Sequence, residues 1–181
     1  MPHIFELAPS ARAKCRGCGL AIAKGELRFG ERLPNPFATG ENADNVEMTH
    51  WFHVTCAAYR RPESFLATVP DATAEIEHKA DLVHEAELGV AHRRLPRLGG
   101  AERASSGRAT CRNCKELIPK DTWRIALVFY EEGRFVPSGF VHVACVAAYC
   151  ETVEVMPRIR HFSAALTETG AAELAAELAA N

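Results

Sequence analysis

Cys15-Arg16-Gly17-Cys18 belongs to the first of two matching sets of metal-binding residues in this chain of 181 residues. The set is completed, after 34 intervening residues, by His53-Val54-Thr55-Cys56. Cys111-Arg112-Asn113-Cys114 and His142-Val143-Ala144-Cys145 make up the second set. Each set supplies three thiols and one imidazole, which is the number of ligands that a closed tetrahedral zinc site needs. Because no coordination position remains for a catalytic water, the sequence predicts two structural Zn²⁺ ions.

The two sets belong to an internal repeat. Residues Arg12 to Arg28 align with Arg108 to Arg124 at an offset of 96, and eight of the 17 aligned positions are identical. The offset falls to 89 at the His-x2-Cys pairs, because the first repeat has seven extra residues between its ligand pairs. Residues 34–45, which contain three Asn, two Pro and one Gly, are typical of a loop and accommodate the insertion. Buried cysteines without metal would not explain the duplication of a whole ligand set.

Each repeat is predicted to form a small α+β, zinc-stabilised module with a short antiparallel sheet and helices. The apolar, β-rich residues 27–33 and 123–130 predict strands. Strand ends that lead into short helices are expected at 51–60 and 140–149, and longer helices at 80–93 and 164–180. We expect a first module at 1–95, a Gly-, Arg- and Ser-rich linker at 96–105, and a second module at 106–181 with a C-terminal helix.

Composition excludes several other classes of protein. Hydrophobic residues make up 48% and charged residues 24%, which is typical of a globular protein. The seven cysteines are odd in number, paired with histidines, and not preceded by a signal-peptide pattern, which favours metal over disulfides. We interpret Cys150 as a buried free thiol. No apolar stretch is long enough for a membrane span, so no membrane partner is expected.

The flanking residues resemble those of the poly(ADP-ribose) polymerase-type zinc finger. Ser106 to Cys111, Ile118 to Asp121, Arg124 and Val136-Pro137 are similar to the first finger of the nuclear polymerase. In the first repeat, Leu33 to Phe37 and Trp51-Phe52-His53 are closer to the finger of DNA ligase III. The resemblance covers residues 8–95 and 105–178. It implies a tandem of two such fingers, of a stand-alone and bacterial kind.

The resemblance implies binding to DNA nicks, breaks or ends by structure rather than sequence. The arginines before each Cys pair and ten residues after it match the phosphate grip of the family, at Arg12, Arg28, Arg108 and Arg124. An arginine fork suits phosphate oxygens, and neutralised phosphates release counterions. The expected apolar caps for an exposed end base pair are Phe37 and Met48, with Val46, in the first repeat, and Phe135, Val136 and Pro137 in the second.

The same residues have plainer interpretations. An arginine near a Cys3His site can simply balance its charge, and apolar loop residues can pack on their own module. The formal net charge is −2, and metallation of six thiolates makes it about two units more negative, whereas nucleic-acid binders are usually basic. Glu41, Asp44 and Glu47 in the first loop and Glu131 and Glu132 in the second oppose phosphate.

Three functional hypotheses follow from these residues. The first is a nonenzymatic protein that binds DNA breaks. The second is a zinc-stapled adaptor for a protein partner, which the acidic charge favours. The third, an enzyme, has little support, because no nucleophile triad, Gly-rich phosphate loop or hydrolytic metal motif is present and we identify no catalytic residues. We expect a cytoplasmic, nucleoid-associated protein in a bacterium or a nuclear one in a eukaryote, and the sequence does not fix the oligomeric state.

Overall fold

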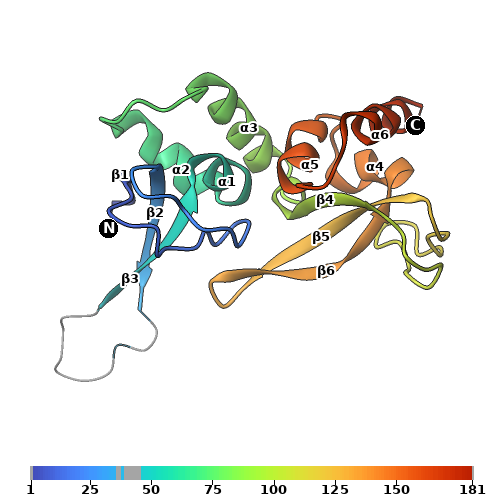
Figure 1. Ribbon diagram of the computed structural model, residues 1–181, viewed down its shortest axis with the longest axis horizontal. Coiled ribbons are helices and arrows are strands. Elements are labelled where there is room, and N and C mark those ends of the chain that lie inside the picture. Colours follow the sequence, from blue (N-terminus) through green and yellow to red (C-terminus); the bar gives the residue numbers. More distant parts are fainter. Residues whose placement is uncertain (1, 36–37, 39–45, 181) are drawn as a thin grey trace. The chain divides into compact units, whose positions relative to one another are not determined.

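The computed structural model describes residues 2–35, 38 and 46–180. The chain divides into two compact units, Met1–Val90 and Ala91–Asn181 (Figure 1). Each unit contains a three-stranded antiparallel sheet, helices and one Cys3His cluster, so the predicted small α+β fold class is confirmed. Among the described residues, no helix combines the length and the apolar character that crossing a bilayer requires.

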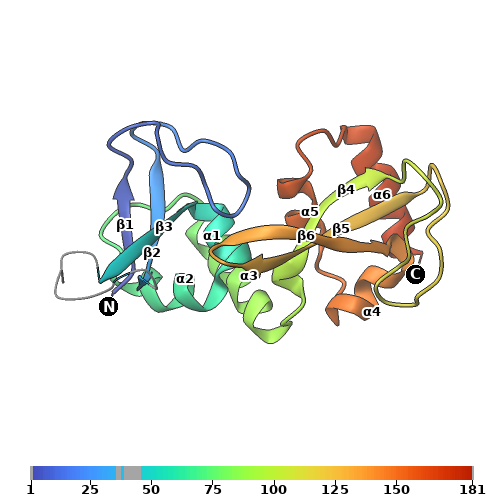
Figure 2. The ribbon, with the colours of Figure 1, turned by 90° about the horizontal axis from the view of Figure 1, so that it is seen from below.

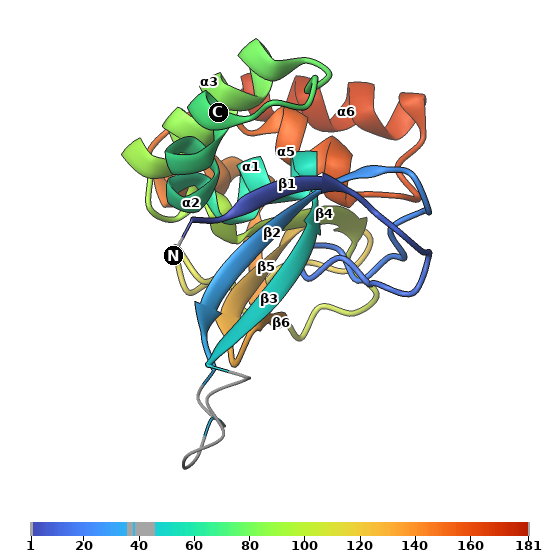
Figure 3. The ribbon, with the colours of Figure 1, turned by 90° about the vertical axis from the view of Figure 1, so that its left-hand side faces the viewer.

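Unit 1 is built on the sheet β1-β2-β3, with β1 at Ile4–Leu7, β2 at Leu27–Pro34 and β3 at Glu47–His53 (Figure 3). Phe5, Phe29 and Phe52 occupy one register position across the three strands. Phe65, from helix α2 at Pro62–Thr68, packs against Phe5 and Phe29 with ring centroids 5.9 and 6.3 Å apart. This aromatic cluster forms the core of the unit, and Phe29, Phe52 and Phe65 are fully buried.

The helices of unit 1 follow the sheet. Helix α1 spans Val54–Arg60, α2 spans Pro62–Thr68, and a short 3-10 helix, η2, spans Val69–Asp71. Helix α3 spans Lys79–Ala91. Because β3 ends at His53 and α1 begins at the next residue, the last two ligands lie at the junction between a strand and a helix.

Unit 2 repeats the arrangement with the sheet β4-β5-β6, and its helices α5 and α6 lie on one side of the sheet (Figure 2). The strands are β4 at Leu98–Arg103, β5 at Trp123–Glu131 and β6 at Arg134–His142. The helical segments are η3 at Leu95–Arg97, η4 at Val143–Cys145, α4 at Val146–Cys150, α5 at Met156–Phe162 and α6 at Glu168–Ala179.

Each sheet has two chemically different faces because successive side chains of a strand point to opposite sides. The helix-side face carries the buried Phe29 and Glu31 in unit 1 and Ile125 and Leu127 in unit 2. The opposite face carries Arg28 in unit 1 and Arg124 in unit 2, and we call it the arginine face.

Glycine is required at one position of the arginine face in unit 1. A Cβ atom at Gly30 would lie 2.6 Å from the ring of Trp51 and 2.9 Å from Ile4, its two cross-strand neighbours. The indole of Trp51 therefore lies flat against the strand only because residue 30 has no side chain.

The expectation of a linker at 96–105 needs correction, because residues 98–103 form β4 and pair with β5. Gly99 and Gly100, which suggested a linker, permit close packing instead. A Cβ atom would lie 3.0 Å from the carbonyl oxygen of Ala126 at Gly99 and 2.4 Å from that of Phe162 at Gly100. Glycine composition alone does not distinguish a mobile segment from a crowded one.

The other predicted elements are confirmed, with shifted ends. Strands β2 and β5 cover the two predicted strands, and α3 and α6 cover the two longer helices. Helix α6 begins four residues later than predicted because Thr167 is its N-cap and its side chain accepts a hydrogen bond from Gly170 N–H. Cys150 is buried at 1% exposure, and burial raises the pKa of its thiol to about 12.

Candidate metal centres and a repeated arginine clamp

The first Cys pair of each unit lies on a tight backbone turn. In unit 1, Gly19 N–H donates to Cys15 C=O at 2.8 Å, and in unit 2, Lys115 N–H donates to Cys111 C=O at 3.0 Å. The donor residue has a positive φ in both turns, 79° at Gly19 and 69° at Lys115. Each turn is tied to its sheet by Arg16 N–H to Trp51 C=O and by Arg112 N–H to Phe140 C=O, both at 2.8 Å.

The histidine of each set presents the same ring nitrogen to the thiols. His53 Nδ1 lies 3.3 Å from Cys18 Sγ and 3.9 Å from Cys56 Sγ. His142 Nδ1 lies 3.4 Å from Cys114 Sγ and 3.9 Å from Cys145 Sγ. The other nitrogen, Nε2, lies within hydrogen-bonding distance of a backbone carbonyl in both units, which fixes the tautomer that leaves Nδ1 free to bind metal.

The distances within each cluster fit a zinc ion. The four ligand atoms of each set lie within 4.8 Å of one another. Ideal tetrahedral geometry, with Zn–N and Zn–S bonds of about 2.0 and 2.3 Å, separates nitrogen from sulfur by about 3.5 Å, close to the observed distances. The predicted ligands are therefore brought together in two clusters that can hold metal ions.

Without metal, the thiols within each cluster differ in pKa. Hydrogen bonds with Cys18 and Cys56 lower the pKa of Cys15 to about 3. Hydrogen bonds with Cys15 and Cys18, in turn, raise the pKa of Cys56. Burial opposes ionisation at Cys111, but backbone N–H groups of His142, Cys114 and Asn113 lower its pKa to about 6. Burial raises the pKa of Cys145 to about 11. A divalent cation is what allows all three thiols of a set to ionise together.

Arg28 and Arg124 are held in identical settings on the arginine faces. Arg28 forms an ion pair with Glu6, and its guanidinium lies 3.5 Å from the ring centroid of Trp51. Arg124 pairs with Glu102 and lies 3.6 Å from the ring of Phe140. We call the arginine, the carboxylate and the ring a clamp. Both clamps obey the repeat offsets of 96 and 89.

The clamps leave part of each guanidinium free. Nε and Nη2 of Arg28 both donate to Glu6, and the same atoms of Arg124 donate to Glu102. Nη1 makes no hydrogen bond within the described residues in either clamp. The side chains are 8% exposed, and Nη1 is the nitrogen whose donors are not used by the clamp.

The other predicted DNA residues differ in their surroundings. Arg12 and Arg108 are exposed beside the Cys turns. Phe135 packs against Tyr130 with ring centroids 4.9 Å apart and the planes tilted by 49°, and both lie with Pro137 on the arginine face of the β5–β6 hairpin. Val136 pairs with Phe129 and therefore points to the helix-side face. Met48 is half-buried opposite Leu33, and Phe37 lies outside the described residues.

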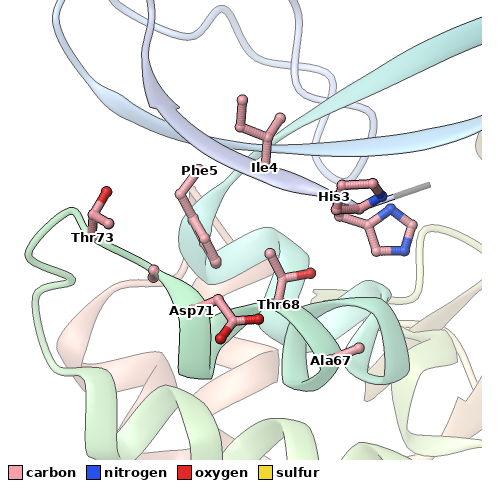
Figure 4. Close-up of a pocket in the computed structure, with 9 residues that line it drawn as sticks. His3, Ile4, Phe5, Ala67, Thr68, Asp71 and Thr73 are labelled. Carbon is pink, nitrogen blue, oxygen red and sulfur yellow. The ribbon is translucent and has the colours of Figure 1, made fainter.

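A hollow of about 470 Å³ in unit 1 lies away from these groups. Side chains of His3 and Phe5 from the β1 segment lie on the side of Thr68 and Asp71 from α2 and η2, whereas Ile4 points away from them (Figure 4). Asp71 is the one carboxylate among its lining residues, and His3 Nδ1 accepts a hydrogen bond from Arg32 N–H. No metal-binding or nucleophilic set gathers there among the described residues.

Sequence reasoning missed Glu6 and Glu102, which anchor the clamps. Neither residue lies in the aligned segment that defined the repeat, although both obey its offset of 96. Extending the alignment toward the N-terminus would have paired them. Their carboxylates would then have suggested ion pairs with Arg28 and Arg124, which are themselves aligned in the repeat and lie on the neighbouring strands.

Comparison with known proteins agrees with this geometry. Residues 6–91 match the family model for the poly(ADP-ribose) polymerase and DNA-ligase Zn-finger region. Unit 1 is thus similar to zinc-finger regions of the poly(ADP-ribose) polymerase type.

Related proteins extend the similarity beyond unit 1. The chain is 28% identical over 145 residues to poly(ADP-ribose) polymerase of Drosophila melanogaster and 29% identical over 140 residues to poly(ADP-ribose) polymerase 1 of Gallus gallus. It is 25% identical over 173 residues to the polynucleotide 3'-phosphatase ZDP of Arabidopsis thaliana. The matches cover 72%, 69% and 80% of this chain but 14%, 13% and 24% of the relatives. They are too long to lie within one unit.

Proposed function

We propose that this chain is a nonenzymatic protein with two zinc fingers that binds DNA at nicks, breaks or ends. It recognises the structure of the DNA rather than its sequence. The observation that carries the proposal is the clamp, built twice at fixed repeat offsets beside a Cys3His cluster. A single clamp could be an accident of packing, whereas two copies with different aromatic rings indicate selection for the position of the arginine.

Zn²⁺ in each site ties the Cys turn to the junction between strand and helix. Unit 1 and unit 2 correspond in this proposal to the first and second fingers. The ligands Cys15, Cys18, His53 and Cys56 hold one ion, and Cys111, Cys114, His142 and Cys145 hold the other. With four protein ligands each ion is closed to substrate and serves only to stabilise the fold.

The clamp suits a phosphate better than a fully solvated arginine does. The carboxylate and the ring restrict the guanidinium to one orientation, so less side-chain entropy is lost when Nη1 donates to a phosphate oxygen. The paired carboxylate weakens the net charge, and the exposed Arg12 and Arg108 supply further positive potential. Phosphates bound this way release counterions, and affinity falls with added salt.

Selectivity for breaks comes in this proposal from apolar caps. Phe135 and Pro137 share the arginine face with Arg124, so one surface of the hairpin can contact both the phosphates and the exposed end base pair. In unit 1 the candidate cap is Met48, beside the insertion; it pairs with Leu33 and therefore points to the helix-side face rather than to the face that carries Arg28. Stacking on an exposed base is worth roughly 1–3 kcal/mol, and an intact duplex offers no such surface.

Fluorescence anisotropy of the zinc-loaded protein tests the proposal. The probes are a nicked duplex, a blunt-ended duplex and a closed circular duplex of equal length, each at two ionic strengths. We expect tighter binding to the nicked and blunt-ended probes, with a steep loss of affinity at higher salt. Equal binding to all three probes, or binding that is indifferent to salt, would contradict break recognition.

An adaptor for a protein partner is the second candidate, and Glu131 and Glu132 favour it. Both side chains are exposed at the tip of the β5–β6 hairpin, beside the proposed cap residues. Replacing both with glutamine should strengthen DNA binding if the hairpin approaches phosphates. No change in DNA binding, together with loss of a partner that survives nuclease treatment, would favour the adaptor.

A further inference from the structure

We propose that unit 2 binds a phosphorylated nucleotide in a basic pocket on the helix-side face of its sheet. The pocket has a volume of about 540 Å³ and is lined in part by Arg94, Arg97, Arg112 and Lys115. None of its nine lining residues is Asp or Glu. A cavity of this size matches a small organic ligand rather than a lone ion.

The pocket is separate from the proposed DNA surface. Leu127 and Phe129 line it, and these odd-numbered residues of β5 point away from the face that carries Arg124. The inference therefore does not rest on the proposed function, and either one can fail without the other.

The cations of the pocket are held in place by carbonyl groups rather than by carboxylates. Arg112 Nε donates to Ser138 C=O at 2.9 Å, and Lys115 Nζ donates to Arg112 C=O at 2.7 Å. Arg94 Nη1 lies 3.4 Å from Tyr149 C=O. None of these three residues forms an ion pair within residues 2–35, 38 and 46–180. Their remaining N–H groups are available to an anion from outside the chain.

Unit 1 has an internal anion at the corresponding position. Glu31, the counterpart of Leu127 at the offset of 96, is fully buried. Its carboxylate accepts from Arg61 Nε at 2.8 Å and from Ser64 Oγ at 2.6 Å. Unit 2 keeps Arg112, the counterpart of Arg16, but has an apolar residue where the carboxylate would be. A bound phosphate would supply the negative charge that unit 1 provides for itself.

The aromatic side chain at the mouth of the pocket points to a nucleotide. The ring of Phe129 is 47% exposed, and Arg97 lies over it with its guanidinium carbon 5.3 Å from the ring centroid. Aromatic rings and guanidinium planes are the surfaces on which nucleobases stack. Arginine and lysine side chains with free donors are the usual partners of phosphate. The pocket thus combines both requirements of one ligand class.

Calorimetric titration of the zinc-loaded full chain at low salt tests the inference. The probes are deoxyadenosine 5'-monophosphate, deoxyadenosine, inorganic phosphate, and one single-stranded octanucleotide with and without a 5'-phosphate. We expect the monophosphate to bind about tenfold or more tightly than deoxyadenosine, because charged hydrogen bonds are lost without the phosphate. Tighter binding of the phosphorylated octanucleotide would identify a DNA end as the source, and tighter binding of the monophosphate a free nucleotide.

Two variants and one control localise the binding. The double substitution Arg94→Gln with Arg112→Gln removes two exposed cations and should weaken binding about tenfold. Leu127→Glu supplies the carboxylate of unit 1 and should abolish binding, and the zinc content reports whether each variant folds. Arg16→Gln in unit 1 is the matched control and should change nothing. Absence of binding by every phosphorylated probe, or full affinity in the zinc-loaded double variant, would overturn the inference.

Discussion

The two units agree on the arginine faces of their sheets and differ on the helix-side faces. Both hold a clamped arginine beside a Cys3His cluster, although tryptophan supplies the ring in unit 1 and phenylalanine in unit 2. On the helix-side face, unit 1 buries Glu31 with Arg61, and unit 2 has Leu127 near Arg94, Arg112 and Lys115, which form no ion pair in the part of the chain that the structure describes. The two units therefore share the zinc-ligand cluster and the clamp, and they differ in how charge is balanced on the far side of the sheet.

The cores of the two units also differ in their side chains. The register position that holds Phe5, Phe29 and Phe52 in unit 1 holds Ala101, Ile125 and Val141 in unit 2. The side chains of unit 2 at this position are smaller, and Gly100 lies against the backbone of α5 at Phe162. A metal crosslink tolerates this change, because less of the stability of a small module then depends on its apolar core.

Among the changes that separate the two units, the loss of a zinc ligand is expected to have the largest effect on folding. Cys56→Ser should unfold unit 1 and Cys111→Ser should unfold unit 2, because zinc contributes on the order of 10 kcal/mol to the folding of such modules. Each variant should retain one of two equivalents of zinc by elemental analysis, with the other unit still folded in its NMR spectrum. Cys150→Ser is the control and should retain both. Two equivalents in either ligand variant would refute the assigned ligand sets.

Removal of the buried carboxylate should affect unit 1 alone. Glu31→Leu copies the residue of unit 2 and removes the carboxylate that accepts from Arg61 and Ser64. Because Arg61 is 26% exposed and can be rehydrated, the loss is expected at about 1.5–3 kcal/mol, which urea unfolding of the zinc-loaded protein would measure. Glu63→Gln changes an exposed residue on α2, the helix that carries Ser64, and the free energy of unfolding should stay within about 0.5 kcal/mol of the parent. A similar small change for Glu31→Leu would mean that the network contributes little.

The clamps can be compared directly by their effect on DNA. Arg28→Gln and Arg124→Gln should each weaken binding to a nicked duplex about tenfold and each reduce the salt slope by about one. Arg160→Gln, an exposed arginine on α5, should leave the affinity unchanged. An effect of only one of the two clamp substitutions would show that the fingers divide the work. No effect of either would leave the clamps a purely structural role.

Acid should destabilise unit 1 slightly through His50, a group that unit 2 replaces with Gly139. Burial lowers the pKa of His50 below 6.5, and Arg16 acts in the same direction. Unfolded chains then bind more protons, so stability is complete above pH 6.5 and declines as the pH falls toward the lowered pKa. Urea unfolding between pH 7.5 and 6.0, with zinc content monitored, should show a smaller pH dependence for His50→Gln. An identical slope would contradict the assignment.

The sequence predicted the parts of this protein that depend on local spacing. Ligands three residues apart fall on one turn or at one strand end, so the two sets could be grouped from Cys15 to Cys145 by spacing and repetition. The strands β2 and β5 were predicted from continuous apolar patterns. The strand β4 was not, because Gly99 and Gly100 suggest flexibility until the crowding around them is known.

By itself, the sequence determined the duplication, the donor set of each site and the α+β class, since these follow from residue identity at fixed separations. Only the tertiary structure decided which charges meet. Glu6 reaches Arg28, and Glu31 is buried against Arg61, across separations of 22 and 30 residues that no local pattern reveals. The sign and size of an electrostatic interaction depend on distance and burial, and both are set by how the strands and helices pack.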